Sequence, residues 1–271
     1  MDEYFNLLMD SVETPGDVNF RIEWKEGRGR CLVATTTIQP GQIIFREKCV
    51  VKGPLHNTSP VCLNCLSKVS GEYKCSDCYL PLCKPECKGD HQTFECNLFQ
   101  LAKNKIDISD FTPACPLYQC ITPLRCLLTR DNWPEKYIKI KGQEAHREKA
   151  EVGEHWSICQ TNIVDYLIKS WKLDFSRNEI NHVIGCLEVN SFEINLVKGG
   201  RGRGVFPLLA LLSHSCVSNV KYVYEDTEDG GWMTCAATVL IREGEELLDH
   251  YISNLESTIR RRQFLRHTLL I

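Results

Sequence analysis

The spacing of hydrophobic positions predicts strands towards both ends of the chain. Residues 20–56 consist of short β-branched and apolar runs, which are interrupted at Gly27-Arg28-Gly29 and at Pro40-Gly41. Such glycine and proline pairs are typical of tight turns. The pattern returns in residues 188–252, where VKYVY and WMTCAATVLI flank the loop EDTEDGG. Both segments therefore indicate short strands joined by turns.

The middle of the chain, residues 99–187, has the spacing of helices. Ile163, Leu167 and Trp171 recur every four residues and predict one apolar helix face. Ser176 followed by Glu179 is a capping-box signature, so a second helix is expected to begin there. Residues 255–270 predict a further short helix, which is basic.

Residues 57–98, between the first strands and the helices, are rich in residue types that bind metal. Two C-x-x-C pairs come first, a C-x-x-x-C pair follows, and a histidine and a cysteine complete the set. Each pair can direct two sulfurs at one ion, so eight ligands suffice for two tetrahedral zinc sites. Few apolar residues lie between them, and metal binding is expected to supply much of the folding free energy. The eight residues are Cys62, Cys65, Cys75, Cys78, Cys83, Cys87, His91 and Cys96.

Composition and charge argue against a secreted, a nucleic-acid-binding and a membrane-spanning protein. A disulfide framework would need a secreted protein, and residues 1–17 lack the basic start and apolar run of a signal peptide. Location in the nucleus or the cytoplasm is therefore expected, and the other eight cysteines are expected to be small buried residues. The net charge of −3 gives no case for nucleic acid, and no apolar run is long enough to span a membrane.

Four further motifs have little meaning one by one. They are the turn Gly27-Arg28-Gly29, the triplet Asn190-Ser191-Phe192, LLSHSCVSN at 211–219 and GEELLDHY at 244–251. Alone, a Gly-x-Gly is usually only a turn, a histidine between serines is usually a core residue, and a tyrosine after a strand usually packs. Their order around a cysteine-rich segment is the informative feature.

Taken together, the motifs resemble those of the SET and MYND domain (SMYD) lysine methyltransferases, from about residue 20 to about residue 266. The insect branch is resembled most through ITPLRCLL (121–128), NIVDYL (162–167) and KLDFS (172–176). The family splits its SET domain around a MYND zinc finger and a helical insert, and GRGVFP (202–207) matches its second half. The resemblance implies an α+β fold. Its segments would be an N-terminal SET part (1–56), a MYND finger (57–98), a helical insert (99–187) and a C-terminal SET core (188–271).

The resemblance also assigns roles to single residues. Methyl transfer from S-adenosylmethionine to lysine needs positioning and electrostatic stabilisation more than acid–base groups. Tyr251 matches the SET tyrosine, which would orient the amine and the sulfonium at the mouth of the lysine channel. The remaining matches would bind the cofactor, with Arg28 on its carboxylate and Asn190 on its amino group or ribose. They are Gly27, Arg28, Gly29, Asn190, Ser191, Ser213 and His214.

By the same resemblance the finger ligands interleave. One zinc would be held by Cys62, Cys65, Cys83 and Cys87, and the other by Cys75, Cys78, His91 and Cys96. The spacing from His91 to Cys96 is one residue longer than the family's H-x-x-x-C, which bears on the geometry of the second site. Such fingers in relatives bind proline-rich peptides or other proteins, and a purely structural finger is the alternative.

The chain departs from the family pattern at three places. Ser213 replaces the family's asparagine, and Ser218 replaces its proline. The sequence ends at Ile271 without the post-SET C-x-C-x-x-C, so Cys216 has no partners for a third zinc. These departures leave two hypotheses, a lysine methyltransferase of low activity in the chain as given, or an inactive SET scaffold whose finger binds proteins. Cofactor binding distinguishes them.

Overall fold

The computed structural model describes residues 2–101, 108–146, 154–196, 200–227, 230–253 and 255–267. The chain forms two compact units. The first unit comprises 1–50 together with 206–271, and the second comprises 51–205. Helices and sheets occur together, which confirms the predicted α+β fold.

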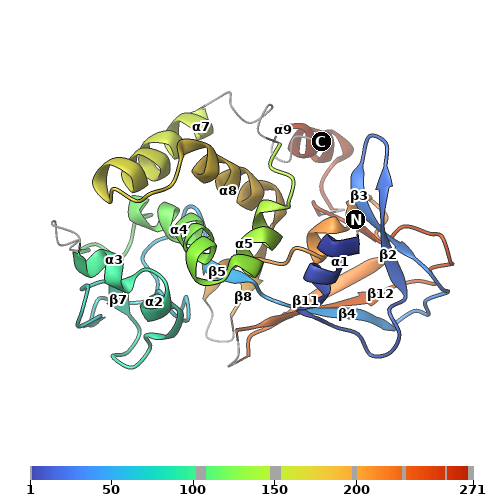
Figure 1. Cartoon of the computed structure of the whole chain (residues 1–271), viewed down its shortest axis with the longest axis horizontal. Coiled ribbons are helices and arrows are strands. Elements are labelled where there is room, and N and C mark those ends of the chain that lie inside the picture. The colour runs from blue at the N-terminus through green and yellow to red at the C-terminus, as the bar shows by residue number, and fades with distance from the viewer. Residues whose placement is uncertain are drawn as a thin grey trace. The chain divides into compact units, whose positions relative to one another are not determined.

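A four-stranded antiparallel sheet forms the frame of the first unit (Figure 1). Its strand order is β1 (Val12–Glu13), β4 (Ile43–Lys48), β12 (Trp232–Ala237) and β11 (Val220–Glu225). Every second residue of β12 is buried, which is the two-residue period that places alternate side chains on opposite faces of a sheet. The strands predicted on either side of the acidic loop are therefore paired neighbours.

Two short pairings and three helical segments complete the first unit. A hairpin joins β2 (Phe20–Lys25) to β3 (Gly29–Ala34), and β10 (Ser213–His214) pairs in parallel with β13 (Leu248–Asp249). The predicted basic helix is α9 (Thr258–His267). Two helical segments were not predicted, and they are α1 (Asp2–Met9) and the 3-10 turn η2 (Leu209–Leu211).

In the second unit, a three-stranded antiparallel sheet accompanies a group of helices. The sheet has the order β5 (Val51–Pro54), β9 (Arg201–Val205) and β8 (Ser191–Asn195). Helix α4 contacts β5, α5, α8 and the π-helix η1, so it is the centre of the helical group. The helices are α4 (Pro116–Asn132), α5 (Pro134–Lys141), α7 (Glu154–Cys159), η1 (Gln160–Ser170) and α8 (Arg177–Asn190).

Of the two helices predicted in this unit, the structure confirms the start of one and shows a different helix type for the other. The capping box is confirmed. The Ser176 hydroxyl accepts the Glu179 N–H, and the Glu179 carboxylate accepts the Ser176 N–H. The apolar stripe lies on a π-helix, in which each N–H donates five residues back. Leu167 is buried, but Trp171 is already the C-cap, and its N–H donates to the Tyr166 carbonyl over 3.3 Å.

The cysteine-rich segment has its own small elements. They are β6 (Tyr73–Lys74), β7 (Pro81–Leu82), α2 (Gly89–Thr93) and α3 (Cys96–Leu101). The few apolar residues of this segment nevertheless form a small core. Leu63, Leu66 and Leu80 are fully buried, and the buried Tyr118 hydroxyl of α4 donates to the Val61 carbonyl over 2.7 Å. The apolar residues are few, but neighbouring elements of the same unit enclose them.

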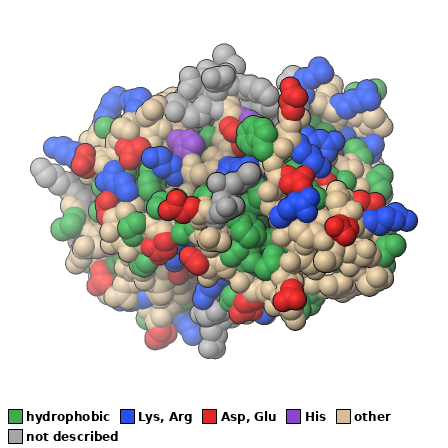
Figure 2. Space-filling view, turned by 45° about the vertical axis from the view of Figure 1, so that its right-hand side comes forward, with side chains coloured by type: hydrophobic (Ala, Val, Ile, Leu, Met, Phe, Trp, Pro, Cys, Tyr) green, Lys and Arg blue, Asp and Glu red, His purple; other side chains and the backbone are tan. Residues whose placement is uncertain are grey.

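Acidic and basic side chains are interspersed on the face seen in Figure 2. This mixture agrees with a net charge of only −3. Within the described ranges, no helix has the length and apolar character needed to cross a membrane.

Glu47 generates a prediction about the stability of the first unit. Its side chain is fully buried in β4, and its two carboxylate oxygens accept the N–H groups of Leu208 and Leu209, each over 2.8 Å. Hydrogen bonds to a charged group contribute about 1.5–3 kcal/mol each, so Glu47→Ala should lower the free energy of unfolding by about 3 kcal/mol or more. Glu47→Gln retains one acceptor and should lose less.

Denaturant titration followed by circular dichroism measures the effect, with Glu243→Ala at an exposed turn position as the control. Equal free energies of unfolding for Glu47→Ala and Glu243→Ala would contradict this role for the buried carboxylate.

Candidate functional site

The structure brings the eight predicted metal ligands together in two groups, both in the second unit. The ligand atoms of each group lie within 4.8 Å of one another. In the first group, the sulfurs of Cys62 and Cys87 are 3.7 Å apart, and those of Cys65 and Cys83 are 3.5 Å apart. The second group is fully buried and contains Cys75, Cys78, His91 and Cys96.

The distances within both groups fit a tetrahedral ion. In the second group, the Cys75 and Cys96 sulfurs are 3.5 Å apart, and the Cys78 sulfur lies 3.2 Å from Nε2 of His91. A zinc–sulfur bond of about 2.3 Å gives tetrahedral sulfur–sulfur edges of about 3.8 Å, whereas a disulfide is about 2.05 Å long. All these cysteines are free. The donor set and spacing therefore suit zinc and exclude disulfides in this structure.

Each C-x-x-C pair closes the same type of turn. The N–H of Leu66 donates to the Cys62 carbonyl over 2.8 Å, and the N–H of Tyr79 donates to the Cys75 carbonyl over 2.9 Å. Leu66 and Tyr79 both have positive φ, 56° and 69°, which is unusual for residues other than glycine. Two turns of one form thus present two sulfurs each, and the surrounding fold holds their backbones in a disfavoured conformation.

Neighbouring donors also affect the ionisation of these thiols. The hydrogen bond with the Cys62 thiol lowers the pKa of Cys65 to about 4. Burial opposes ionisation of Cys75, but backbone N–H donors of Cys78 and Asp77 lower its pKa to about 7. Each group therefore contains one sulfur that is stabilised as a thiolate, the form that binds metal.

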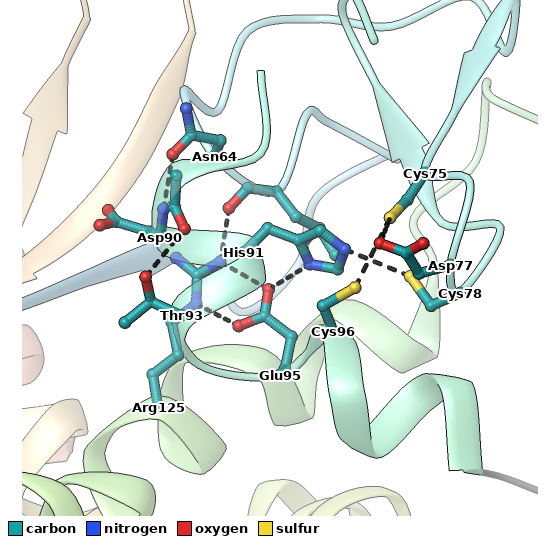
Figure 3. Close-up of polar contacts among 12 residues, drawn as sticks. Asn64, Cys75, Asp77, Cys78, Asp90, His91, Thr93, Glu95, Cys96 and Arg125 are labelled. Carbon is teal, nitrogen blue, oxygen red and sulfur yellow. Dashed lines mark hydrogen bonds and ion pairs between the residues drawn. The ribbon is translucent and has the colours of Figure 1, made fainter. Parts of the chain in front are cut away.

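Glu95, which directly precedes Cys96, supports the second group (Figure 3). It accepts from Nδ1 of His91 over 2.9 Å, which fixes the ring with Nε2 towards Cys78. A carboxylate behind a histidine ligand orients the ring and increases its basicity. The four ligand atoms lie together despite the spacing of one extra residue between His91 and Cys96.

Arg125 of α4 neutralises Glu95. Its Nε donates to the carboxylate over 2.8 Å and its Nη1 donates to the Lys52 carbonyl over 2.9 Å, while Nη2 donates to Glu95 and to the Leu63 carbonyl. His91, Glu95 and Arg125 are all completely buried. The network thus joins the finger, the central helix and strand β5 within one unit.

Asn64 links the two finger groups through its side-chain amide. Its oxygen accepts the N–H of Asp90 over 2.8 Å, and its nitrogen donates to the Cys87 sulfur over 3.2 Å. A Cβ at Gly89 would lie 2.4 Å from the Asn64 oxygen, so only glycine leaves room for this contact. Helix α2, which carries His91, is thereby held against the first group.

In the first unit, the predicted glycine turn lies beside Glu246. Gly27 and Gly29 have φ of 74° and 77°, which explains why glycine occupies both positions. The Arg28 guanidinium pairs with Glu246 over 3.1 Å, and the Lys25 amine pairs with the same oxygen over 2.9 Å. Burial opposes ionisation of Glu246, but hydrogen bonds from Ser213 and Lys25 outweigh it and lower the pKa of this carboxyl. Arg28 is therefore engaged in the structure as it stands.

Ser213, His214 and Tyr251 also come together in the first unit. Ser213 and His214 pair with Leu248 and Asp249. The rings of His214 and Tyr251 have centroids 5.2 Å apart, and the Tyr251 N–H donates to Nδ1 of His214 over 3.1 Å. Nδ1 is thus an acceptor, which requires a neutral ring, and burial lowers the pKa of His214 in agreement. The Tyr251 hydroxyl donates to the Leu212 carbonyl.

Asn190 and Ser191 belong to the second unit, where α8 meets β8. The Asn190 amide nitrogen donates to the Glu144 and Cys186 carbonyls, over 2.7 and 3.0 Å, and the Ser191 hydroxyl donates to the Leu187 carbonyl over 2.5 Å. Both amide hydrogens of Asn190 thus have backbone acceptors. A cofactor contact by these two residues stays a prediction.

Sequence reasoning missed the residues that support the predicted ligands and motifs. A glutamate four residues after His91 is a signal for Glu95, because a carboxylate beside a histidine ligand commonly orients the ring. Glu246 is the second glutamate of the GEELLDHY motif, but nothing local indicates its partners. Arg125 lies in the matching segment ITPLRCLL, but neither its role nor that of Asn64 could be predicted, since both depend on partners at least 23 residues away.

Comparison with known proteins places these features in context. The family model described as SET domain matches residues 29–252. The chain is 25% identical to SET domain-containing protein SmydA-8, isoform A, of Drosophila melanogaster over 258 residues, which covers 92% of this chain and 54% of that protein. It is 27% identical to human N-lysine methyltransferase SMYD2 over 253 residues, with 89% and 55% covered. The predicted resemblance to SMYD proteins, including their insect branch, is confirmed.

The chain spans about half the length of the curated relatives it matches. Histone-lysine N-methyltransferase Smyd1 of Mus musculus, for example, is 25% identical over 275 residues, with 92% of this chain and 53% of that protein covered. Among solved structures, the SET domain of LSMT bound to lysine and AdoHcy aligns with a TM-score of 0.50 at 12% identity, over 93% of this chain and 54% of that one. That likeness supports the SET fold alone.

The buried ion pair generates a second stability prediction. Arg125→Met would leave the Glu95 carboxylate buried without its partner, and breaking a buried pair typically costs about 3–5 kcal/mol. Thermal and denaturant unfolding measure this loss. Arg130→Met on the same helix is the matched control, since Arg130 is partly exposed and pairs with exposed Asp131, and it should cost far less. Similar losses for both variants would contradict the role assigned to Arg125.

Proposed function

The chain belongs to the SET domain family, and from that premise we propose that it is an S-adenosylmethionine-dependent protein-lysine N-methyltransferase of SET and MYND type. The names of its relatives support this proposal, since Smyd1 and SMYD2 are called lysine methyltransferases. The substrate would be a lysine side chain of a histone or another protein. A nuclear or cytoplasmic location is proposed with it, because free cysteines suit a reducing compartment.

The placement of Tyr251 is the observation that carries the proposal. Its ring lies beside that of His214. Its N–H donates to Nδ1 of His214, and its hydroxyl donates to the Leu212 carbonyl. The hairpin at Gly27–Gly29 is tied through Arg28 to Glu246, which is in the same short segment as Tyr251. Motifs more than 200 residues apart in the chain therefore adjoin one segment of the first unit. We propose that this surface binds the cofactor.

The groups present fit methyl transfer without a strong base. The cofactor, when bound, supplies a methyl group on a positively charged sulfur. Burial, followed by the charges of Asp249 and Glu246, raises the pKa of Tyr251, so its hydroxyl keeps its proton at neutral pH. It therefore orients the lysine amine and the methyl group rather than accepting a proton. Ser213 and the neutral His214 would hold the cofactor beside it.

Substitution of Tyr251 tests the proposal. Tyr251→Phe should lower the turnover of S-adenosylmethionine-dependent lysine methylation by about 10²–10³, because one preorganised hydroxyl at the reacting group is lost. Methylation of histone and other peptide libraries, followed by mass spectrometry, measures the product. Tyr224→Phe removes a tyrosine hydroxyl from β11 in the same unit and is the matched control. Unchanged circular dichroism must accompany the loss, and full activity of Tyr251→Phe would refute the assignment.

We further propose that the finger holds two zinc ions, one in each group of four ligands. The Glu95 contact to His91 gives a test of the second group. Glu95→Gln should weaken zinc binding there by about 10–100-fold, the usual effect of removing a carboxylate that supports a ligand. Competition with a coloured chelator measures both affinities, and Glu86→Gln at an exposed finger position is the control. Unchanged zinc affinity in Glu95→Gln would count against this arrangement. An equal loss of affinity in Glu95→Gln and Glu86→Gln would count against it as well.

A second candidate function is protein binding by the finger, with the SET fold as an inactive scaffold. The observation in its favour is that Tyr73 and Tyr79 of the finger are 38% and 46% exposed. Exposed aromatic side chains are the usual platform for proline-rich peptides. Calorimetry separates the two candidates. A methyltransferase binds S-adenosylmethionine, whereas a scaffold binds a proline-rich peptide without binding the cofactor.

A further inference from the structure

A third cluster of metal-ligand residues lies in the second unit, outside the finger. His56 follows strand β5, and His155 and Cys159 are four residues apart on α7, so their side chains share one helix face. Their ligand atoms all lie within 4.8 Å of one another. None of the three belongs to the motifs considered so far, and two segments about 100 residues apart in sequence bring them together.

The distances in this cluster match the edges of a metal tetrahedron. Nε2 of His155 is 3.7 Å from the Cys159 sulfur and 3.4 Å from Oε2 of Glu188. Zinc bonds of about 2.0–2.1 Å to nitrogen and oxygen and about 2.3 Å to sulfur give nitrogen–sulfur edges of about 3.6 Å and nitrogen–oxygen edges of about 3.4 Å. The His155 nitrogen and the Cys159 sulfur are therefore as far apart as two ligands of one ion.

His56 provides an independent observation. Its Nδ1 is buried and has no hydrogen-bond partner in the structure. Its ring centroid is 5.1 Å from that of His155, with the two planes tilted by 57°. A buried polar atom without a partner is costly, and a cation held by both rings would satisfy it. The side chain of His155 is 57% exposed, so an ion can reach the cluster from solvent.

We propose that His56, His155 and Cys159 bind a divalent cation of borderline softness, namely Zn²⁺. Two imidazoles and one thiolate are the donors such an ion prefers, and three protein ligands leave a fourth position for water. The site differs from the finger groups, which supply four ligands each. It would tie the segment after β5 to helix α7.

Glu188 has a second contact that bears on the charge of the site. Its Oε1 is 3.4 Å from Nη1 of Arg203, while its Oε2 is the oxygen near His155. The Glu188 carboxylate therefore neutralises the positive charge of Arg203 through one oxygen, and its other oxygen lies near the cluster. A simple His155–Glu188 ion pair without metal is the competing account of these contacts, and the two accounts differ in whether Cys159 becomes a metal-bound thiolate.

Cobalt titration of the zinc-loaded 271-residue chain tests the proposal. Co²⁺ takes the place of Zn²⁺ in such sites, and it absorbs in the visible when tetrahedral and in the near ultraviolet when bound to thiolate. Wild-type protein should show both bands at one added equivalent. Cys159→Ser should abolish the thiolate band, and His155→Gln should lower Co²⁺ affinity at least about tenfold, as loss of even a supporting group does.

Cys186 is the matched control. It is buried on a helix, and its sulfur lies 3.4 Å from Nε2 of His182, four residues away, but His182 is engaged with the Lys141 carbonyl over 2.8 Å. In the described part of the chain this pair has no third ligand, so Cys186→Ser should leave the cobalt spectrum unchanged. This comparison separates the proposed site from any histidine–cysteine pair on a helix.

Three results would overturn the proposal. They are a wild-type titration without a thiolate band, the same band in Cys159→Ser, and unchanged affinity in His155→Gln. If Cys159→Ser does not fold, His155→Gln at the exposed position still decides the question, with folding checked by circular dichroism. Exchange of cobalt into the finger would give a band that persists in both variants, and that outcome counts against the third site.

Discussion

The buried pair of Glu95 and Arg125 is the interaction on which the second unit most depends. Neither charge reaches solvent, so each is tolerable only beside the other. The pair also uses its remaining hydrogen-bonding capacity, on the His91 ring at one end and on the Lys52 and Leu63 carbonyls at the other. A finger ligand, a strand and the central helix are thus fixed by one set of charges.

This arrangement changes how the finger is understood. A finger held only by metal would unfold on its own when the ion is removed. Here buried leucines and the charged pair connect it to α4, so part of its stability comes from the helices of the same unit. Metal would then complete the two ligand groups and fix their geometry, on a backbone that already carries two residues at positive φ, Leu66 and Tyr79.

Carboxylates organise the first unit in a similar way. Glu47 is fully buried and fixes the start of the 3-10 turn. Glu246 forms ion pairs with Lys25 and Arg28 of the hairpin that contains the glycine turn. Asp249 is buried beside them, and burial raises its pKa to about 6. Beyond burial, the charges of Asp249 and Glu246 also raise the pKa of Tyr251, so acidic groups of this unit act on the residue that we propose to be catalytic.

The sequence alone determined the fold class, the main strands, the capped helix at Ser176 and the residue types of the finger. These features are local, because periodicity, turn residues and ligand spacing operate over a few positions. The ordered motifs likewise indicated the family, which the match over 29–252 confirms. The roles of Tyr251 and the cofactor residues remain predictions of that resemblance.

Only the tertiary structure decided what depends on distant partners. It placed the apolar stripe on a π-helix, enclosed the finger's leucines and engaged Arg28 with Glu246. It also brought His56 next to His155, across about 100 residues of chain. No local pattern encodes such pairs, because burial and charge compensation are satisfied by whichever residues the completed fold brings into contact.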